Sequence, residues 1–302
     1  MSMMSKIVIG TWPLSGDFGA KSLADIEASI TKALDAGIRC FDTAPNYGLG
    51  FAESMLGMVL AGEEDVEVFT KCGNVPFVGK DFSPDAIEAS IQQSLKRLKR
   101  TSIEGVFLHN PRTEVTVYEP LIERLEALRA QGLVNQIGLS GAKGYDYSSV
   151  PEGRLDMFQQ DANLLYLDEA HGAHPRFRTF FARSPLATGI LSGRLSEDST
   201  YPADDHRSGW LKGDRLSSLV KRVDAIRNIL PSGVSVPSAA RRFLMNNPFI
   251  DRLICGIGRP EHLDGIIEDA TAGPLPKKTI DALMDLHDRD FDRPAEEAGL
   301  GY

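Results

Sequence analysis

Hydrophobic and polar positions follow two different periods along the chain, and the two alternate from one end to the other. Short apolar segments of strand length are each followed by a longer segment with apolar residues at helical spacing. The strand-like segments are eight in number and cover residues 6–10, 38–42, 66–71, 103–110, 134–141, 155–163, 179–186 and 252–257.

The helical segments begin at residues that favour helix starts. Ser22 precedes a segment in which Ile26 and Ile30 lie on one face, and Ser83 followed by Pro84 opens another. Strands that alternate with helices pair in parallel through right-handed crossovers. Eight such units favour a closed (β/α)8 TIM barrel over an open doubly wound sheet, and we expect one domain over residues 1–302.

Two stretches interrupt this pattern. Residues 166–178 contain glycine and proline and are too short for a full covering helix, so we expect a shortened or irregular sixth helix there. Residues 192–210 are polar and lack apolar periodicity, which predicts a long mobile loop, and the pattern leaves the conformation of residues 192–212 open. A final helix and a short tail are expected from about residue 276.

Composition and charge narrow the function classes. The 42% hydrophobic and 25% charged content is ordinary for a globular protein. The formal net charge of −9 argues against a general binder of nucleic acid or of an anionic membrane, since both need clustered cations. One basic cluster, residues 96–100, falls at the end of a predicted helix, where cations suit the helix dipole. We therefore expect a small-molecule partner, and the oligomeric state is not predicted.

The cysteines and the first residues favour a cytoplasmic protein. Cys40, Cys72 and Cys255 are far apart and form no CxxC pair, so neither a disulfide framework nor a metal site is indicated. Residues 1–10 lack the long apolar run of a signal peptide, and no later segment approaches the length of a membrane span.

Polar side chains stand at the ends of the predicted strands, where the active site of such a barrel lies. Listed in chain order, these positions are Asp42 with Tyr47 just beyond it, Lys71, His109, Ser140, Gln159, Ser184 and Gly256. Each alone has an ordinary structural explanation, but four successive rim positions with titratable groups indicate a catalytic site.

The titratable groups suit acid and base chemistry on an oxygen. A cation such as Lys71 favours the phenolate of Tyr47 and is expected to lower its pKa, while Asp42 keeps the lysine charged. His109 is placed to orient the substrate oxygen or to share its proton. The set suits polarising a carbonyl group and protonating its oxygen, but it lacks a hydride donor, so a cofactor is required.

The last part of the chain contains two segments that are suited to bind a dinucleotide. Residues 184–194 and 256–264 supply small residues and backbone amides after the seventh and eighth strands, where barrels often bind phosphate. Ser140 and Gln159 are able to hold an amide group. The Rossmann signature is missing, because the third glycine of GxGxxG is replaced by Glu53 in "GLGFAE" and by Glu261 in "GIGRPE".

Several motifs together resemble the aldo-keto reductase family over about residues 9–270. They are "GTWPLSG", "FDTAPNYGLGFAESMLG", "FTKCG", "SIQQSLKRL", "FLHNP", "LRAQGLVNQIGLSG", "SPLATGILSGR" and "GIGRPEHLD". The resemblance implies a (β/α)8 barrel that binds a nicotinamide cofactor, NADP(H) more commonly than NAD(H), and exchanges a hydride with an aldehyde or ketone.

The same resemblance implies roles for individual residues. The catalytic set falls on Asp42, Tyr47, Lys71 and His109, with Tyr47 as the general acid or base. The expected cofactor contacts are Thr11, Trp12, Asp42, Ser140, Gln159, Arg183, Ser184, Leu186, Gly189, Leu191, Gly193, Gly256, Arg259 and His262. In this set the loop from Ser184 to Gly193 covers the pyrophosphate, and the segment from Gly256 to His262 holds the adenosine end.

Three positions depart from the family pattern. Gly141 replaces a common asparagine, and Arg183 stands where a tyrosine often stacks on the nicotinamide. The charge of Arg183 disfavours a cationic ring, so we expect the reduced cofactor to bind more tightly than the oxidised one. Ile266 replaces an asparagine at the adenosine end, where Arg259 and His262 remain as partners for a 2′-phosphate, and the choice between NADP and NAD stays open.

The leading expectation is an oxidoreductase that reduces a small carbonyl compound. The alternatives are a sugar (aldose) dehydrogenase that runs in the oxidative direction and a regulatory protein that binds the cofactor without turnover. A third is an aldolase or lyase that forms a Schiff base on Lys71. The loop "FDTAPNYGLG" is similar to that of sugar dehydrogenases and pyridoxal reductases of the family, which favours a polar, hydroxylated substrate.

Overall fold

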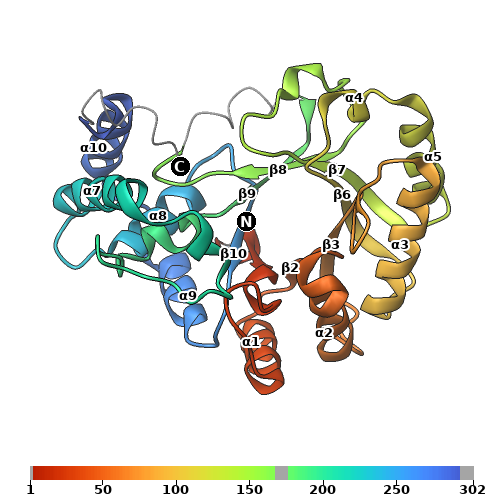
Figure 1. Ribbon diagram of the computed structural model, residues 1–302, viewed down its shortest axis with the longest axis horizontal. Helices are drawn as coiled ribbons and strands as arrows, with labels where there is room; N and C mark the ends of the chain where they lie inside the picture. The colour runs from red at the N-terminus through yellow and green to blue at the C-terminus, as the bar shows by residue number, and fades with distance from the viewer. Residues whose placement is uncertain (1–2, 167–175, 293–302) are drawn as a thin grey trace.

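The fold is a closed parallel barrel, seen in a computed structural model that describes residues 3–166 and 176–292 (Figure 1). The strands pair in the order β1-β10-β9-β8-β7-β6-β3-β2. They are β1 (Ile7–Gly10), β2 (Cys40–Asp42), β3 (Glu67–Cys72), β6 (Ile103–His109), β7 (Val134–Ser140), β8 (Met157–Asp161), β9 (Thr179–Arg183) and β10 (Arg252–Gly256). The eight predicted strands and the (β/α)8 barrel are therefore confirmed.

Helices surround the barrel in the arrangement expected for this fold (Figure 1). They are α1 (Leu23–Asp35), α2 (Phe51–Val59), α3 (Pro84–Leu98), α4 (Thr113–Thr116), α5 (Glu119–Ala130), α7 (Gly213–Ile229), α8 (Val236–Met245), α9 (His262–Ala272) and α10 (Lys277–Asp288). The short sixth helix expected over residues 166–178 falls largely on residues 167–175, which lie outside the described residues.

Local sequence explains the helix starts only in part. The Ser22 hydroxyl accepts a hydrogen bond from the backbone N–H of Asp25 and so caps α1 as expected. Ser83 occupies the same position before α3 but makes no such bond, and Pro84 begins the helix. Helix α2 begins at Phe51. Its start follows a tight turn rather than a polar cap.

Three apolar clusters hold the fold together. The barrel interior is filled by side chains from the strands, among them Phe69, Phe107 and Phe181, whose rings contact one another. A larger cluster lies between the strands and the surrounding helices. A third joins α7, α8 and α10 with the segment 187–191 that follows β9. This last cluster anchors a loop at the carboxyl end of the barrel.

Two features at that end were not predicted. A two-stranded hairpin, β4 (Asn74–Val75) with β5 (Gly79–Lys80), follows β3. The predicted irregular loop 192–212 contains a short helical turn, His206–Gly209, and crosses to the segment after β1. There Phe18 pairs with Asp205 and the His206 N–H donates to the Asp17 carbonyl, 3.2 Å away. The loop thereby closes over one side of the barrel mouth.

Candidate active site

The strand alternation places the predicted site residues directly above the barrel core. Successive side chains of a strand point to opposite faces, so residues two apart share a face. Lys71 follows the inward Phe69, His109 follows Phe107, and Gln159 follows the inward Met157 at this spacing. A layer of polar groups therefore lies on a floor of aromatic and apolar side chains.

Asp42 and Lys71 form a fully enclosed ion pair at the centre of this layer. The Lys71 side chain is 0% exposed, and its Nζ lies 2.7 Å from Asp42 Oδ1. The same ammonium donates to the carbonyl oxygen of Thr43 at 2.9 Å. Burial, the largest single effect, lowers the pKa of Lys71, but Asp42 and Tyr47 together outweigh it, so the pKa is raised and the lysine stays charged.

Tyr47 lies against this ion pair. The Lys71 Nζ is 4.8 Å from the centroid of its ring. The Tyr47 ring stacks on Trp12 with centroids 6.1 Å apart and meets His109 edge-on at 6.3 Å. The geometry thus brings Asp42, Tyr47, Lys71 and His109 together, as the strand ends predicted.

The expected lowering of the Tyr47 pKa is wrong for the protein as it stands. Burial raises the pKa of Tyr47 above 10.0, and the opposing effect of Lys71, though in the expected direction, is smaller. The phenol is therefore protonated at neutral pH. The residue types show the nearby cation but not how much water the fold removes from the phenol.

His109 is held in its neutral form. Burial lowers its pKa well below 6.5, and the charges of Lys71, Arg183 and Lys80 lower it further. Its Nδ1 is buried and has no hydrogen-bond partner among the described residues. A buried polar atom without a partner is costly, so this nitrogen is available for a bound molecule. Lys80 reaches this region because its Nζ donates to the Asn110 carbonyl at 2.8 Å.

Ser140 and Gln159 are linked to the ion pair by a buried chain of hydrogen bonds. The Ser140 hydroxyl donates to Gln159 Oε1 at 2.9 Å, and Gln159 Nε2 donates to Asp42 Oδ2 at 2.8 Å. Asp42 is therefore shared between Lys71 and Gln159. The hydroxyl and the side-chain amide present both donors and acceptors, which suits the carboxamide of a nicotinamide ring.

Gly141 and Arg183, the two departures from the family pattern near the ring, are explained by packing. A Cβ atom at Gly141 would lie 2.3 Å from the hydroxyl of Tyr147, so a larger residue there would require Tyr147 to shift. Arg183 donates to the Gly141 carbonyl at 2.9 Å and lies 3.4 Å from Asp161. Asp161 pairs with Arg183 across β8 and β9 and partly neutralises its charge.

The loop from Ser184 to Gly193 contains several residues in the left-handed conformation. Ser184, Thr188 and Gly189 have φ values of 58°, 56° and 98°, a left-handed conformation that non-glycine residues adopt only at a cost. Such turns direct successive N–H groups toward one side. Leu191 is 0% exposed within the apolar cluster of α7 and α8, so it contributes through its backbone rather than its side chain.

A basic cluster surrounds the start of α9. His262 Nδ1 accepts a hydrogen bond from the Gly258 N–H at 3.2 Å. Burial lowers the pKa of His262, the charges of Arg259, Arg194 and Lys21 lower it further, and the charge of Glu261 opposes them. The sequence did not identify Lys21 as part of this cluster, because it lies far from His262 along the chain. Arg194 is the last residue of the segment "SPLATGILSGR", so that motif was a signal that could have identified it.

Aromatic side chains from two loops form one wall above Tyr47. Trp12 contacts Phe18 with ring centroids 4.9 Å apart and His206 with centroids 5.1 Å apart. Its indole N–H donates to Asp17 at 2.6 Å, which fixes the ring. Thr11 donates through its hydroxyl to the Asp42 carbonyl at 3.1 Å and ties this loop to β2. Phe18 and His206 were not identified from the sequence, since no pattern links the two loops.

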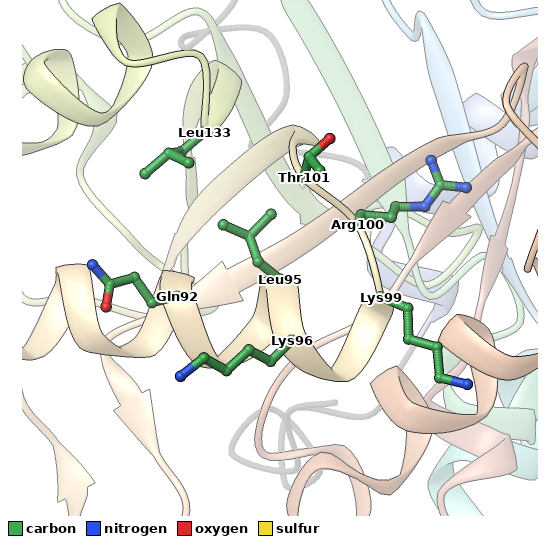
Figure 2. Close-up of a pocket in the computed structure, with 7 residues that line it drawn as sticks. All are labelled: Gln92, Leu95, Lys96, Lys99, Arg100, Thr101 and Leu133. Atoms are coloured by element: carbon green, nitrogen blue, oxygen red, sulfur yellow. The ribbon is translucent and has the colours of Figure 1, made fainter.

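A shallow hollow of about 480 Å³ lies beside the end of α3 and the segment before β7 (Figure 2). The segment before β7 is at the amino ends of the strands, whereas Lys71 and His109 lie at the carboxyl ends. In the described part of the chain, no three His, Cys, Asp or Glu side chains gather to hold a metal ion. Across residues 3–166 and 176–292, no helix has the length and apolar character to cross a membrane.

The fold is a closed (β/α)8 barrel, and these residues form a polar site at the carboxyl ends of its strands. The model of the Aldo/keto reductase family matches residues 6–288, and the chain belongs to that family. Family membership supports an oxidoreductase that uses a nicotinamide cofactor, and small carbonyl compounds or sugars are substrates that fit the family.

Individual relatives cover most of both chains. The protein is 28% identical to D-threo-aldose 1-dehydrogenase from a Pseudomonas species, over 80% of this chain and 83% of the relative. It is 24% identical to the NADH-specific methylglyoxal reductase of Escherichia coli, over 86% and 88%. Its structure resembles the glycerol dehydrogenase of Gluconobacter oxydans with a TM-score of 0.80 and 25% identity, over 96% and 93% of the two chains.

The residues present fit a nicotinamide cofactor. Ser140 and Gln159 offer a donor and acceptors to its carboxamide, and His109, whose Nδ1 is buried without a partner among the described residues, pairs in register with Ser140 on the neighbouring strand. The left-handed turn after β9 suits a pyrophosphate, and the cations around His262 suit the adenosine end.

Proposed function

We propose that this protein is an NADPH-dependent reductase of small aldehydes or ketones, with Tyr47 as the general acid. The supporting observation is the contact between the half-buried, protonated phenol of Tyr47 and the charged Lys71, whose Nζ is 4.8 Å from the ring centroid. The cofactor supplies the hydride. The residues of the chain orient the carbonyl group and deliver the proton to its oxygen.

The raised pKa of Tyr47 favours the reductive direction. A phenol that keeps its proton at neutral pH is ready to donate it, and the phenolate that results is stabilised by Lys71. Asp42 in turn compensates the charge of the lysine at 2.7 Å. Neutral His109 is able to donate a hydrogen bond to the same oxygen without adding a competing charge. These groups therefore stabilise negative charge on the substrate oxygen as it develops.

The basic cluster at α9 supports NADP(H) over NAD(H). Arg259, His262, Arg194 and Lys21 meet where the adenosine end is expected, and a 2′-phosphate is a strong acceptor for such groups. Family membership alone leaves this choice open, because the methylglyoxal reductase of Escherichia coli is NADH-specific.

The second candidate function is oxidation of a sugar or polyol by the same site. Two of the similar proteins are named for these activities, the aldose 1-dehydrogenase and the glycerol dehydrogenase. A Schiff-base aldolase is disfavoured, since the raised pKa of Lys71 keeps its amine protonated and a poor nucleophile.

The test is a titration with NADPH and NADH followed by a panel of carbonyl compounds, sugars and polyols, read at the nicotinamide absorbance. Tyr47→Phe is expected to bind NADPH as the wild type does and to lose nearly all turnover. The exposed Tyr118, at the start of α5, gives the matched control Tyr118→Phe. A wild-type protein that binds NADPH but turns over no member of the panel would instead identify a regulatory protein.

A further inference from the structure

Two sequence features remain without a role after the active site is described: Glu53, at the third-glycine position of "GLGFAE", and the basic cluster at residues 96–100. The structure joins them. Glu53 is 0% exposed, and its Oε2 accepts a hydrogen bond from Arg97 Nε at 2.6 Å. Its other oxygen, Oε1, accepts one from the hydroxyl of Thr70, also at 2.6 Å. We call Glu53, Thr70 and Arg97 the Glu53 network.

The Glu53 network connects three elements behind the active site. Glu53 belongs to α2, Arg97 to α3, and Thr70 to β3. Because side chains alternate along a strand, Thr70 faces outward toward the helices while its neighbour Lys71 faces the barrel interior. The carboxylate of Glu53 is therefore bonded to the residue next to the lysine of the site.

Arg97 also supports the turn that holds Tyr47. In the turn Tyr47–Gly50, three successive residues, Gly48, Leu49 and Gly50, have φ values of 56°, 55° and 92°. The stem of Arg97 packs against Gly50 so closely that a Cβ there would lie 2.8 Å from its Cδ. On the other side of the turn, a Cβ at Gly48 would lie 2.7 Å from the Ser15 carbonyl. A strained turn persists only when its surroundings fix it, and these two contacts do so.

We propose that the Glu53 network positions Tyr47 relative to Lys71, with Glu53, Thr70 and Arg97 as positioning residues that never touch the substrate. One side of the network holds the strand of Lys71 and the other side holds the turn of Tyr47. The proposal rests on the proposed function of Tyr47. It also predicts an effect on the phenol that is measurable without turnover.

Thr70 offers the cleanest test, since two substitutions separate its shape from its hydroxyl. Thr70→Val keeps the branched shape and removes the bond to Glu53, whereas Thr70→Ser keeps the hydroxyl. Thr70→Val is expected to lower kcat about tenfold or more, because small displacements of reacting groups have effects of this size. The KM for substrate and the Kd for NADPH should stay near their wild-type values, and Thr70→Ser should restore most of kcat.

Arg97 and Arg100 form a second matched pair at the end of α3. Arg100 donates to the carbonyls of Val66 and Glu63, near the hollow of Figure 2 and away from Tyr47. Arg97→Met should lower kcat, and Arg100→Met should not. Arg97→Met could fail to fold because Glu53 is left buried without a counter-charge. In that case the double variant Glu53→Gln/Arg97→Met, which also removes the charge of Glu53, replaces Arg97→Met in the test.

The alkaline titration of Tyr47 gives the readout that is independent of turnover. The ultraviolet difference between each protein and the same protein with Tyr47→Phe isolates this phenol. A shifted titration in Thr70→Val, with the wild-type position kept in Thr70→Ser and Arg100→Met, would support the proposal even if no substrate is found. Folded Thr70→Val and Arg97→Met proteins with unchanged titration and unchanged kcat would overturn it, as would an equal loss of kcat in Arg100→Met.

Discussion

Gln159 Nε2 lies 2.8 Å from Asp42 Oδ2, while the other oxygen of Asp42 lies 2.7 Å from Lys71 Nζ. A residue expected to hold the cofactor is thus bonded to the carboxylate that is paired with Lys71. Because Ser140 donates to the same glutamine, the chain runs through four buried side chains. We therefore expect binding of a carboxamide at Gln159 to be coupled through Asp42 to the position of Lys71.

Replacement of Gln159 tests this coupling. Gln159→Leu removes a hydrogen bond to a charged group, which is typically worth about 1.5–3 kcal/mol, and it leaves the Ser140 hydroxyl without its acceptor. We expect the Kd for NADPH to rise about tenfold or more and kcat to fall with it. Fluorescence titration and steady-state kinetics measure the two effects. The control is Gln136→Leu, whose amide bonds Glu104 away from the site. Wild-type cofactor affinity in Gln159→Leu would contradict the assignment.

The charge of Arg183 is expected to distinguish the two redox states of the cofactor. The guanidinium lies 3.4 Å from Asp161, so part of its effect is neutralised. We expect NADPH to bind more tightly than NADP+, by about threefold or more. Asp161→Asn should increase this ratio of affinities, because the charge of Arg183 is then no longer neutralised. Arg183→Gln should decrease the same ratio. Separate titrations with the two forms give the ratios, and equal affinities in the wild type would refute this role.

Selectivity between NADPH and NADH is expected to depend on the cations around α9. Lys21→Ala and Arg259→Ala each remove one charge from the cluster that lowers the pKa of His262. Because exposed ion pairs contribute about 1 kcal/mol or less, each change should weaken NADPH binding about fivefold. NADH has no 2′-phosphate, so its affinity should stay constant. A parallel loss for both cofactors would show that the cluster contacts another part of the nucleotide.

The sequence predicted the strands of the barrel and the rim residues because both depend on local rules. Apolar runs of strand length define β3 and β6, and alternation then places Lys71 and His109 above the core. The resemblance to the family supplied the roles of these residues, and the structure supplied their distances. The family membership itself is confirmed.

What the sequence did not predict depends on contacts between distant segments. The wall formed by Trp12, Phe18 and His206 joins residues nearly two hundred positions apart, without a shared pattern. The direction of the Tyr47 pKa depends on how much water the fold removes, a quantity that residue types alone do not give. Arg97, assigned to a helix end, makes a buried ion pair whose partner lies 44 positions away.

The neutral state of His109 predicts a loss of stability in acid. Its pKa in the folded protein is well below 6.5, whereas in the unfolded chain it is near 6.5, so below that pH the unfolded chain binds the extra proton. The folded state thus loses up to about 1.4 kcal/mol per pH unit from this group as the pH falls below about 6.5. His109→Gln should remove this part of the pH dependence. Urea unfolding of both proteins at pH 7.5 and 5.5 measures it, and parallel losses in the two would contradict the prediction.

The ion pair between Asp42 and Lys71 predicts that stability and activity separate in a double-mutant cycle. Lys71→Met leaves Asp42 buried without the ammonium at 2.7 Å, and removal of one partner of a buried pair typically costs about 3–5 kcal/mol. Asp42→Asn likewise leaves the charge of Lys71 buried without its carboxylate partner. The double variant Asp42→Asn/Lys71→Met removes both charges, so its unfolding free energy should recover to within about 2 kcal/mol of the wild type.

Turnover should not recover with stability in that cycle, because the phenolate of Tyr47 has lost the cation that stabilises it. Urea unfolding and carbonyl reduction, measured on all four proteins of the cycle, separate the two effects. An active double variant would show that the proton transfer does not depend on the charge of Lys71. A double variant as unstable as the single ones would show instead that the pair is held by contacts other than its mutual attraction.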